Sequence, residues 1–282
     1  MKQINLIGSY HNRPIEIYTK IVKIPSNTVT IFVQGLYGVF SITETGDKIN
    51  LLSEKLIVDN ISHCVSYNSS RDFSFTSETE YEERMKAFVE KTFEQELDDL
   101  KKVVSWVTDN SKKIFGIEKD VLILNIHGNS IGGTLSILLK EFFQKIRKIS
   151  LCGSGCGTNG STKPILSSHL AENIILDSVK TFTGELFLLQ GSEDTKVPKE
   201  SGLKILKGAS LAKITHVTVS GANHNFSKMY GVDNKEAEKH FVQILFDFLM
   251  VLVNAAVYYS DEDGLFVAHG YEVPQIGLGS HR

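Results

Sequence analysis

Cysteine is scarce in this chain, and its count is odd. The three cysteines are Cys64, Cys152 and Cys156, and an odd number makes a poor disulfide framework. No second cysteine pair and no nearby histidine completes a zinc site with Cys152 and Cys156. We therefore expect reduced structural thiols, no metal and a cytoplasmic protein.

An excess of positive charge is also missing. The chain has 30 Lys and Arg against 33 Asp and Glu, a net charge of −3, and its basic residues are scattered rather than clustered. This balance indicates a mixed polar surface and no nucleic-acid partner. The apolar run at residues 4–7 is too short for a signal peptide and is soon followed by the polar residues 10–13. Secretion is therefore not supported.

A long uninterrupted hydrophobic run is absent too. The most apolar stretch, residues 241–257, is broken by Gln243, Asp247 and Asn254. It falls short of the about 20 apolar residues that a membrane span requires, and a carboxylate in its middle would be costly in lipid. We predict a buried terminal helix and no stable membrane span. A helix that touches a membrane or forms a homodimer is the alternative.

Several signature motifs do not occur. The chain has no His-x-x-x-His motif or His/Asp cluster with ligand spacing, no Gly-x-x-x-x-Gly-Lys-Ser/Thr phosphate loop and no Gly-x-Gly-x-x-Gly after its first parallel strand. These absences disfavour a metal-dependent hydrolase, a nucleotide hydrolase of the phosphate-loop type and a dinucleotide-binding fold. No internal repeat or low-complexity linker divides the chain.

What the chain does contain is an alternation of short β-rich runs with helical patterns, which is typical of an α/β fold. We predict one domain over residues 1–258, with a mostly parallel eight-stranded sheet and helices on both faces, and a tail of uncertain structure over 259–282. Functional sites of such sheets lie at the carboxyl ends of the strands. The predicted strands are 4–7, 15–18, 29–33, 62–67, 121–126, 149–152, 186–189 and 214–219, the first two as an antiparallel pair. The predicted helices are 47–58, 78–112, 131–145, 166–181, 199–211 and 235–258.

A serine follows the strand at 121–126 in a glycine-rich turn, HGNSIGG at residues 127–133. A serine on a tight strand-to-helix turn adopts strained backbone angles, so Gly128 and Gly132, two positions away, must be small. The turn also directs a helix N-terminus at the site, which favours negative charge there. The alternative is a helix entry that packs tightly or binds phosphate. Its position between a buried strand and a helix favours Ser130 as a nucleophile.

Two further polar residues follow later strands. Asp194 lies in the turn after 186–189, where the adjacent Glu193 competes for the same role, and acidic turn residues often only cap the next helix. His224 lies in a loop of small residues after 214–219. A serine hydroxyl needs a base to become nucleophilic, and a carboxylate behind that base fixes its tautomer. The order Ser130, Asp194, His224 suits this chemistry, with His224 as base.

These three loops resemble those of the α/β-hydrolase superfamily, in its small serine esterase branch. Residues 128–132 resemble its nucleophile elbow, and 191–198 (GSEDTKVP) resemble its Gly-x-x-Asp-x-x-Val-Pro acid loop. Residues 223–226 resemble the histidine loop of small esterases, with Asn223 where an acidic residue often stands. The resemblance covers roughly residues 29–258. It implies the α/β-hydrolase fold, a Ser–Asp–His triad and no cofactor.

The resemblance also implies an oxyanion hole made of two backbone N–H groups. One belongs to Ile131, the residue after the nucleophile. The candidate for the other is Leu36, in the loop 34–38 after the first parallel strand, where this chain has Gln-Gly and many relatives have His-Gly. His127, at the end of the preceding strand, is expected to brace the elbow rather than to act in the chemistry.

The substrate pocket has only candidate residues. Tyr37 and Phe226 either line it or belong to the core. Tyr67, Asn68 and Arg71 follow a strand at the same sheet edge and are candidates for binding a polar substrate group.

The leading functional hypothesis is hydrolysis of a small-molecule carboxylic ester through an acyl-enzyme on Ser130. The loop 153–163 is modest in length, so we expect a minimal lid and a small or extended acyl group. A thioesterase, peptidase or acyltransferase would use the same triad, because a fold does not fix the reaction. A non-catalytic binding protein of this fold is the third hypothesis.

Overall fold

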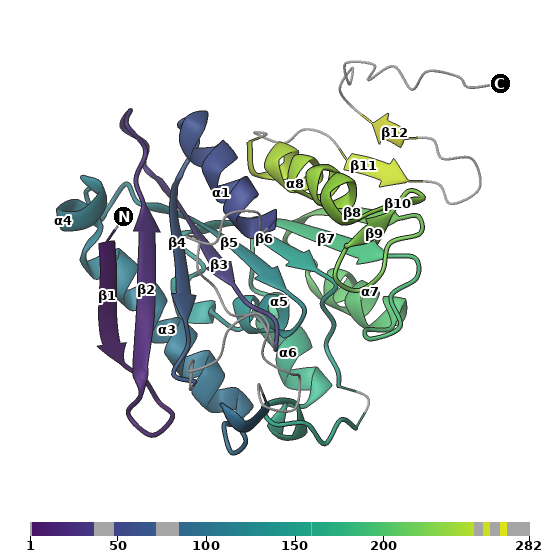
Figure 1. The fold of residues 1–282 in the computed structure, drawn as a ribbon, viewed down its shortest axis with the longest axis horizontal. Helices are drawn as coiled ribbons and strands as arrows, with labels where there is room; N and C mark the ends of the chain where they lie inside the picture. The colour runs from purple at the N-terminus through teal and green to yellow at the C-terminus, as the bar shows by residue number, and fades with distance from the viewer. Residues whose placement is uncertain are drawn as a thin grey trace.

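The computed structural model describes residues 2–36, 48–71, 85–158, 160–250, 256–259 and 266–269. Its centre is an eight-stranded sheet in the order β1-β2-β4-β3-β5-β6-β7-β8 (Figure 1). β2 pairs antiparallel with both β1 and β4, and all other neighbours are parallel. The predicted mostly parallel sheet with an antiparallel opening pair is therefore confirmed. The strands are β1 Lys2–Ile7, β2 Pro14–Lys20, β3 Thr28–Val33, β4 His63–Asn68, β5 Ile123–Asn129, β6 Ile146–Cys152, β7 Glu185–Gly191 and β8 Lys213–Val219.

Helices cover both faces of this sheet (Figure 1). α1 and α8 pack on one face, and α3, α5, α6 and α7 pack on the other. Side chains of β3 alternate between the two cores: Ile31 and Val33 join the α3 side, whereas Phe32 joins the α1 and α8 side. β3, with the sequence TVTIFV, is buried on both faces and largely apolar, which made it visible in the sequence. The helices are α1 Lys48–Val58, α3 Phe93–Asp109, α4 Ser111–Phe115, α5 Ile131–Ser136, α6 Glu172–Val179, α7 Lys199–Gly208 and α8 Asn234–Met250, with short 3₁₀ turns η1 Lys140–Phe142 and η2 Leu166–Ser168.

The helix predicted over 78–112 is confirmed for α3, Phe93–Asp109, but it does not run unbroken through the described residues before it. Residues 87–90 form turns, and α3 begins only at Phe93. Thr92 caps α3, because its hydroxyl accepts from the Gln95 N–H while the Gln95 side chain accepts from the Thr92 N–H. This reciprocal capping box starts a helix and cannot occur inside one. A second short helix, α4, follows Asn110.

Three other predicted helices are too long. The helix predicted over 131–145 ends at Ser136 and is followed by turns and η1, and the one predicted over 166–181 is divided into η2 and α6. The helix predicted to run to Tyr258 is α8, which ends at Met250. Residues 256–259 form β11 (Ala256–Tyr259), which pairs with β12 (Phe266–His269). Val257, Tyr258 and Tyr259 are β-branched or aromatic, and such residues favour strands.

The loops that carry the predicted site leave the sheet at one edge. Parallel strands β3, β5, β7 and β8 all end there, so residues 34–36, 130, 192–198 and 220–227 start from the same side. A two-stranded hairpin of β9 (Lys228–Met229) and β10 (Val232–Asp233) closes the last of these loops. Between β6 and β7, the described residues contain only η2 and α6. Across the described part of the chain, no helix has the length and apolar character to cross a membrane.

Candidate active site

Ser130 occupies a strained turn between β5 and α5. Its backbone has φ 53° and ψ −123°, a region that costs a residue with a side chain about 1–3 kcal/mol. A Cβ at Gly128 would lie 2.4 Å from the backbone nitrogen of Gly133, and one at Gly132 would lie 2.3 Å from the carbonyl oxygen of Gln34. Both distances are shorter than real contacts, so this turn requires glycine at both positions.

The structure brings Ser130, His224 and Asp194 together from three separate loops. The His224 Nε2 lies 3.1 Å from the Ser130 hydroxyl, and the His224 Nδ1 lies 2.8 Å from the Asp194 Oδ2. A carboxylate can only accept, so Nδ1 carries the proton and Nε2 is left to accept from the serine. In such an arrangement a histidine can accept the proton of a serine while a carboxylate fixes its tautomer.

Asp194 is held as an anion. Its Oδ1 accepts hydrogen bonds from the backbone N–H groups of Lys196 (2.8 Å) and Val197 (3.0 Å), while Oδ2 faces His224. Burial alone would raise the pKa of Asp194, but the hydrogen bonds from His224 and from the two backbone groups lower it below its usual value. The neighbouring Glu193 is exposed. Asp194, and not Glu193, is therefore the acid next to His224.

Close backbone contacts hold the histidine loop. A Cβ at Gly191 would lie 2.2 Å from the carbonyl oxygen of Ala222, so β7 and this loop touch. Lys48, from the start of α1, donates a hydrogen bond to the carbonyl of Asn225, the residue after His224. The Lys48 ammonium also lies 4.6 Å from the Phe241 ring centroid on α8. Lys48 thus connects both helices of that face to the loop, and no local sequence pattern pointed to it.

Asn223, which stands where small esterases often have an acidic residue, binds within its own loop. Its Oδ1 accepts from the Ser227 N–H at 3.0 Å, and its carbonyl accepts from the Phe226 N–H at 3.0 Å. The amide therefore closes the turn that presents His224, a role that does not need a carboxylate.

The loop after β3 lies against the elbow. A Cβ at Gly35 would lie 3.4 Å from the Ser130 Cβ, an ordinary contact distance. Leu36, the candidate second oxyanion donor, is buried, as is Ile131, the first residue of α5. The two candidate donors are thus on segments that both adjoin the serine.

The pocket candidates have different outcomes. Tyr37 lies outside the described residues. Phe226 is 1% exposed, and its ring centroid lies 5.2 Å from that of Phe241 in the core under α8. Membership of the core accounts for these contacts of Phe226.

The polar residues at and after the end of β4 are not available to a substrate, contrary to the sequence-based suggestion. Tyr67, Asn68 and Arg71 are all buried. The Asn68 amide donates to the Glu16 carboxylate at 3.1 Å, and Arg71 is paired with Glu96 at 2.6 Å. The side chains of Asn68 and Arg71 thus bind other residues of the protein.

His127 is a buried neutral group beneath the elbow. Its Nδ1 lies 2.8 Å from the Ser150 hydroxyl. Burial, together with the nearby charge of Lys48, lowers the pKa of His127 to about 3. It therefore carries no charge at neutral pH and contributes packing and one hydrogen bond to the base of the turn.

Sequence reasoning missed a group of buried charges beside the loop after β3. It did not single out Glu96 or Asp99, which are 3% and 0% exposed. Both fall on the helix face that also carries Leu100 and Val103. Carboxylates at core-facing helical positions were the signal that could have revealed them.

No protein-family model matches the chain, and no curated protein matches it in sequence. Solved structures do match its fold. Est1E from Butyrivibrio proteoclasticus superimposes with a TM-score of 0.60 at 14% identity, over 88% of this chain and 97% of that one. An esterase domain from a Rhodothermus marinus protein gives 0.58 at 13% identity, over 88% and 96%. A dienelactone hydrolase from Anabaena variabilis gives 0.58 at 13% identity, over 88% and 97%.

Proposed function

Because the chain has the α/β-hydrolase fold, we propose that it is a serine hydrolase that cleaves a small carboxylic ester, with Ser130 as nucleophile, His224 as base and Asp194 as the residue that orients it. The observation that carries this proposal is the pair of hydrogen bonds from Ser130 to His224 (3.1 Å) and from His224 to Asp194 (2.8 Å), built on a strained serine turn. Strain of this kind persists only where the surrounding structure maintains it.

In the proposed reaction, the Ser130 oxygen attacks the ester carbonyl while its proton passes to the His224 Nε2. The carbonyl oxygen becomes an anion, for which the N–H groups of Leu36 and Ile131 are the proposed donors. Collapse of this intermediate expels the alcohol, which takes the proton from His224, and leaves an acyl group on Ser130. Water, deprotonated by His224, then releases the acid and restores the serine.

The proposal extends to substrate class and location. The solved structures with this fold include proteins named as esterases and a dienelactone hydrolase, which favours esters over amides. All three cysteines are free and buried, and burial raises the pKa of Cys64 to about 12, so this thiol is unreactive. Unpaired thiols favour the cytoplasm.

Turnover of short p-nitrophenyl esters tests this function. We expect Ser130→Ala to lose at least about 10⁴-fold in kcat, because the nucleophile is removed. Ser210→Ala is the matched control, since Ser210 is an exposed serine on the surface and the same change there should leave kcat unaltered. Ester turnover that survives in Ser130→Ala would refute the assignment. A parallel panel of thioesters and amides would show which acyl bond is preferred.

A further inference from the structure

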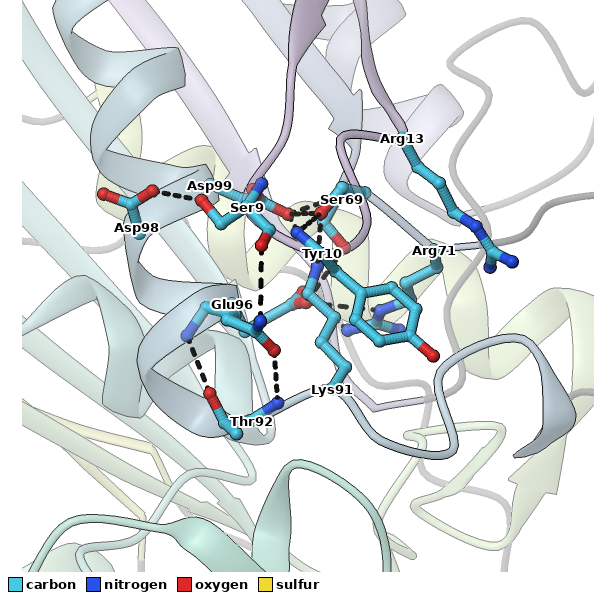
Figure 2. Close-up of polar contacts among 12 residues, drawn as sticks. Ser9, Tyr10, Arg13, Ser69, Arg71, Lys91, Thr92, Glu96, Asp98 and Asp99 are labelled. Atoms are coloured by element: carbon cyan, nitrogen blue, oxygen red, sulfur yellow. Dashed lines mark hydrogen bonds and ion pairs between the residues drawn. The ribbon is translucent and has the colours of Figure 1, made fainter.

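Four charged side chains are buried together next to the loop after β3. This ion cluster consists of Arg71, Lys91, Glu96 and Asp99, whose side chains are 0–4% exposed (Figure 2). It holds two cations and two anions, so its formal charges cancel. Burial of one such charge alone would be very costly, and only mutual pairing makes the group tolerable.

The four members are bound to one another at short distances. The Arg71 guanidinium donates to both Glu96 oxygens, from Nη2 at 2.6 Å and from Nε at 3.4 Å. The Lys91 ammonium bridges the two carboxylates, at 2.7 Å from Glu96 and 2.6 Å from Asp99. Burial alone would raise the pKa of Glu96, but the charges of Arg71 and Lys91 and their hydrogen bonds lower it to about 2. The Glu96 carboxylate is therefore ionised at every physiological pH.

The ion cluster is also bound to two further segments of the chain. Asp99 accepts from the N–H of Ser9 in the β1–β2 turn at 2.8 Å and from the N–H of Ser70 after β4 at 2.7 Å. The Ser69 hydroxyl donates to Glu96 at 3.0 Å. Figure 2 shows these contacts converging on α3 from the turn and from the end of β4. Arg71 is thus fixed by groups on several elements, not by one flexible partner.

One contact of Arg71 leaves the ion cluster. Its Nη1 donates to the carbonyl oxygen of Leu36 at 2.6 Å. At the other end of the same short loop, the Gln34 amide donates to the carbonyl oxygen of Tyr67 at 3.2 Å. Residues at and after the end of β4 therefore hold both ends of the segment 34–36, whose middle residue, Gly35, adjoins Ser130.

We propose that Arg71 is a positioning residue, which holds Leu36 so that its N–H is placed to stabilise the oxyanion. This inference rests on the proposed function. A planar guanidinium suits the task, because its donors leave at fixed angles and can set two partners, Glu96 and Leu36, relative to each other. Oxyanion donors accelerate a reaction only when they are placed beforehand, and a misplacement of about 1 Å can cost about 10²-fold.

The main test removes Arg71 and its partner charge together, in Arg71→Met/Glu96→Gln, so that no lone buried charge is left to unfold the protein. We expect kcat for a p-nitrophenyl ester to fall about 10²-fold, with little change in KM. A trifluoromethyl ketone forms a tetrahedral adduct with the serine, and its alkoxide occupies the oxyanion position. The affinity for this ketone should fall by the same factor as kcat/KM, which a loss of stability alone would not produce.

The matched control is Lys148→Met/Glu185→Gln. This ion pair (3.6 Å) is also largely buried, with side chains 4% and 15% exposed, but it lies on β6 and β7 near the opposite ends of the strands. We expect it to lower stability and to leave kcat and ketone affinity near their original values. A folded Arg71→Met/Glu96→Gln variant with an unchanged kcat would overturn the inference.

A second readout does not depend on turnover. Amide hydrogen exchange at residues 34–36 should accelerate in Arg71→Met/Glu96→Gln and stay unchanged in the control. If the original protein cleaves no ester while exchange still accelerates, the proposed function fails and the positioning of Leu36 stands. If exchange at 34–36 is unaltered, the inference fails whatever the activity.

Discussion

The two sides of Ser130 are held in place differently. On one side, backbone amides bind the Asp194 carboxylate, and a partly exposed loop carries His224. On the other side, a buried group of four charges holds the loop that contains Leu36. His224 is 19% exposed in its side chain, whereas Arg71 is 3% exposed. A base must exchange protons with substrate and water, so contact with solvent serves it. An oxyanion donor needs only to stay in place. The exposure of each side therefore suits the task proposed for it.

On the His224 side, the largest loss of activity should follow from replacing Asp194. We expect Asp194→Asn to lower kcat by about 10³–10⁴-fold, because an amide no longer selects the His224 tautomer that accepts the serine proton. Glu193→Gln is the control, since it neutralises the adjacent but exposed carboxylate and should behave like the original protein. Steady-state ester hydrolysis measures both. Equal losses in the two variants would mean that negative charge anywhere in the loop matters and that Asp194 has no special role.

A smaller loss of activity should follow from a substitution that crowds the loop containing Leu36. In Gly132→Ala, the new methyl group would lie 2.3 Å from the Gln34 carbonyl oxygen and 2.5 Å from that of Val33. We expect a stability loss of about 1–3 kcal/mol from overpacking and about 10²-fold in kcat from the displaced loop. Gly157→Ala is the matched control, because no atom lies within 4 Å of the added methyl group. Urea unfolding and ester kinetics of the two variants should differ; if they agree, the close approach is unimportant.

The smallest effect concerns pH and the charge of Glu96. Its pKa is about 2 in the folded protein, below the ordinary value of 4.5, so ionisation of Glu96 stabilises the fold, and this contribution is fully present above about pH 4.5. This contribution is lost as the pH falls through the folded pKa. The free energy of unfolding, measured between pH 6 and 3, should therefore fall more steeply in the original protein than in Arg71→Met/Glu96→Gln. Parallel curves would contradict the assigned charge state.

The elements that carry local signals were predictable from the sequence. β5 is an apolar run, and the two glycines that flank Ser130 form a recognisable motif. At Gly128 the crowding atoms belong to the same turn, whereas at Gly132 they belong to the end of β3 and the residue after it. Asp194 and His224 follow β7 and β8, so their positions after strands could be seen in the sequence. The sheet order brings the carboxyl ends of these strands to the same side.

What could not be predicted depends on partners from distant elements. Glu96 and Asp99 look like surface residues until Arg71 and Lys91 are placed beside them. The start of α3 has a local signal, because the spacing of Thr92 and Gln95 is that of a capping box. The Gly-rich start of α5 gave no comparable signal for its end at Ser136.

The most direct measurement of the central claim is the site at which a fluorophosphonate ester labels the protein, read by mass spectrometry of the digested chain. We predict one covalent adduct, on Ser130, which forms much more slowly in His224→Ala and is absent in Ser130→Ala. A folded protein that takes up no label, or takes it up at another serine, would contradict the account.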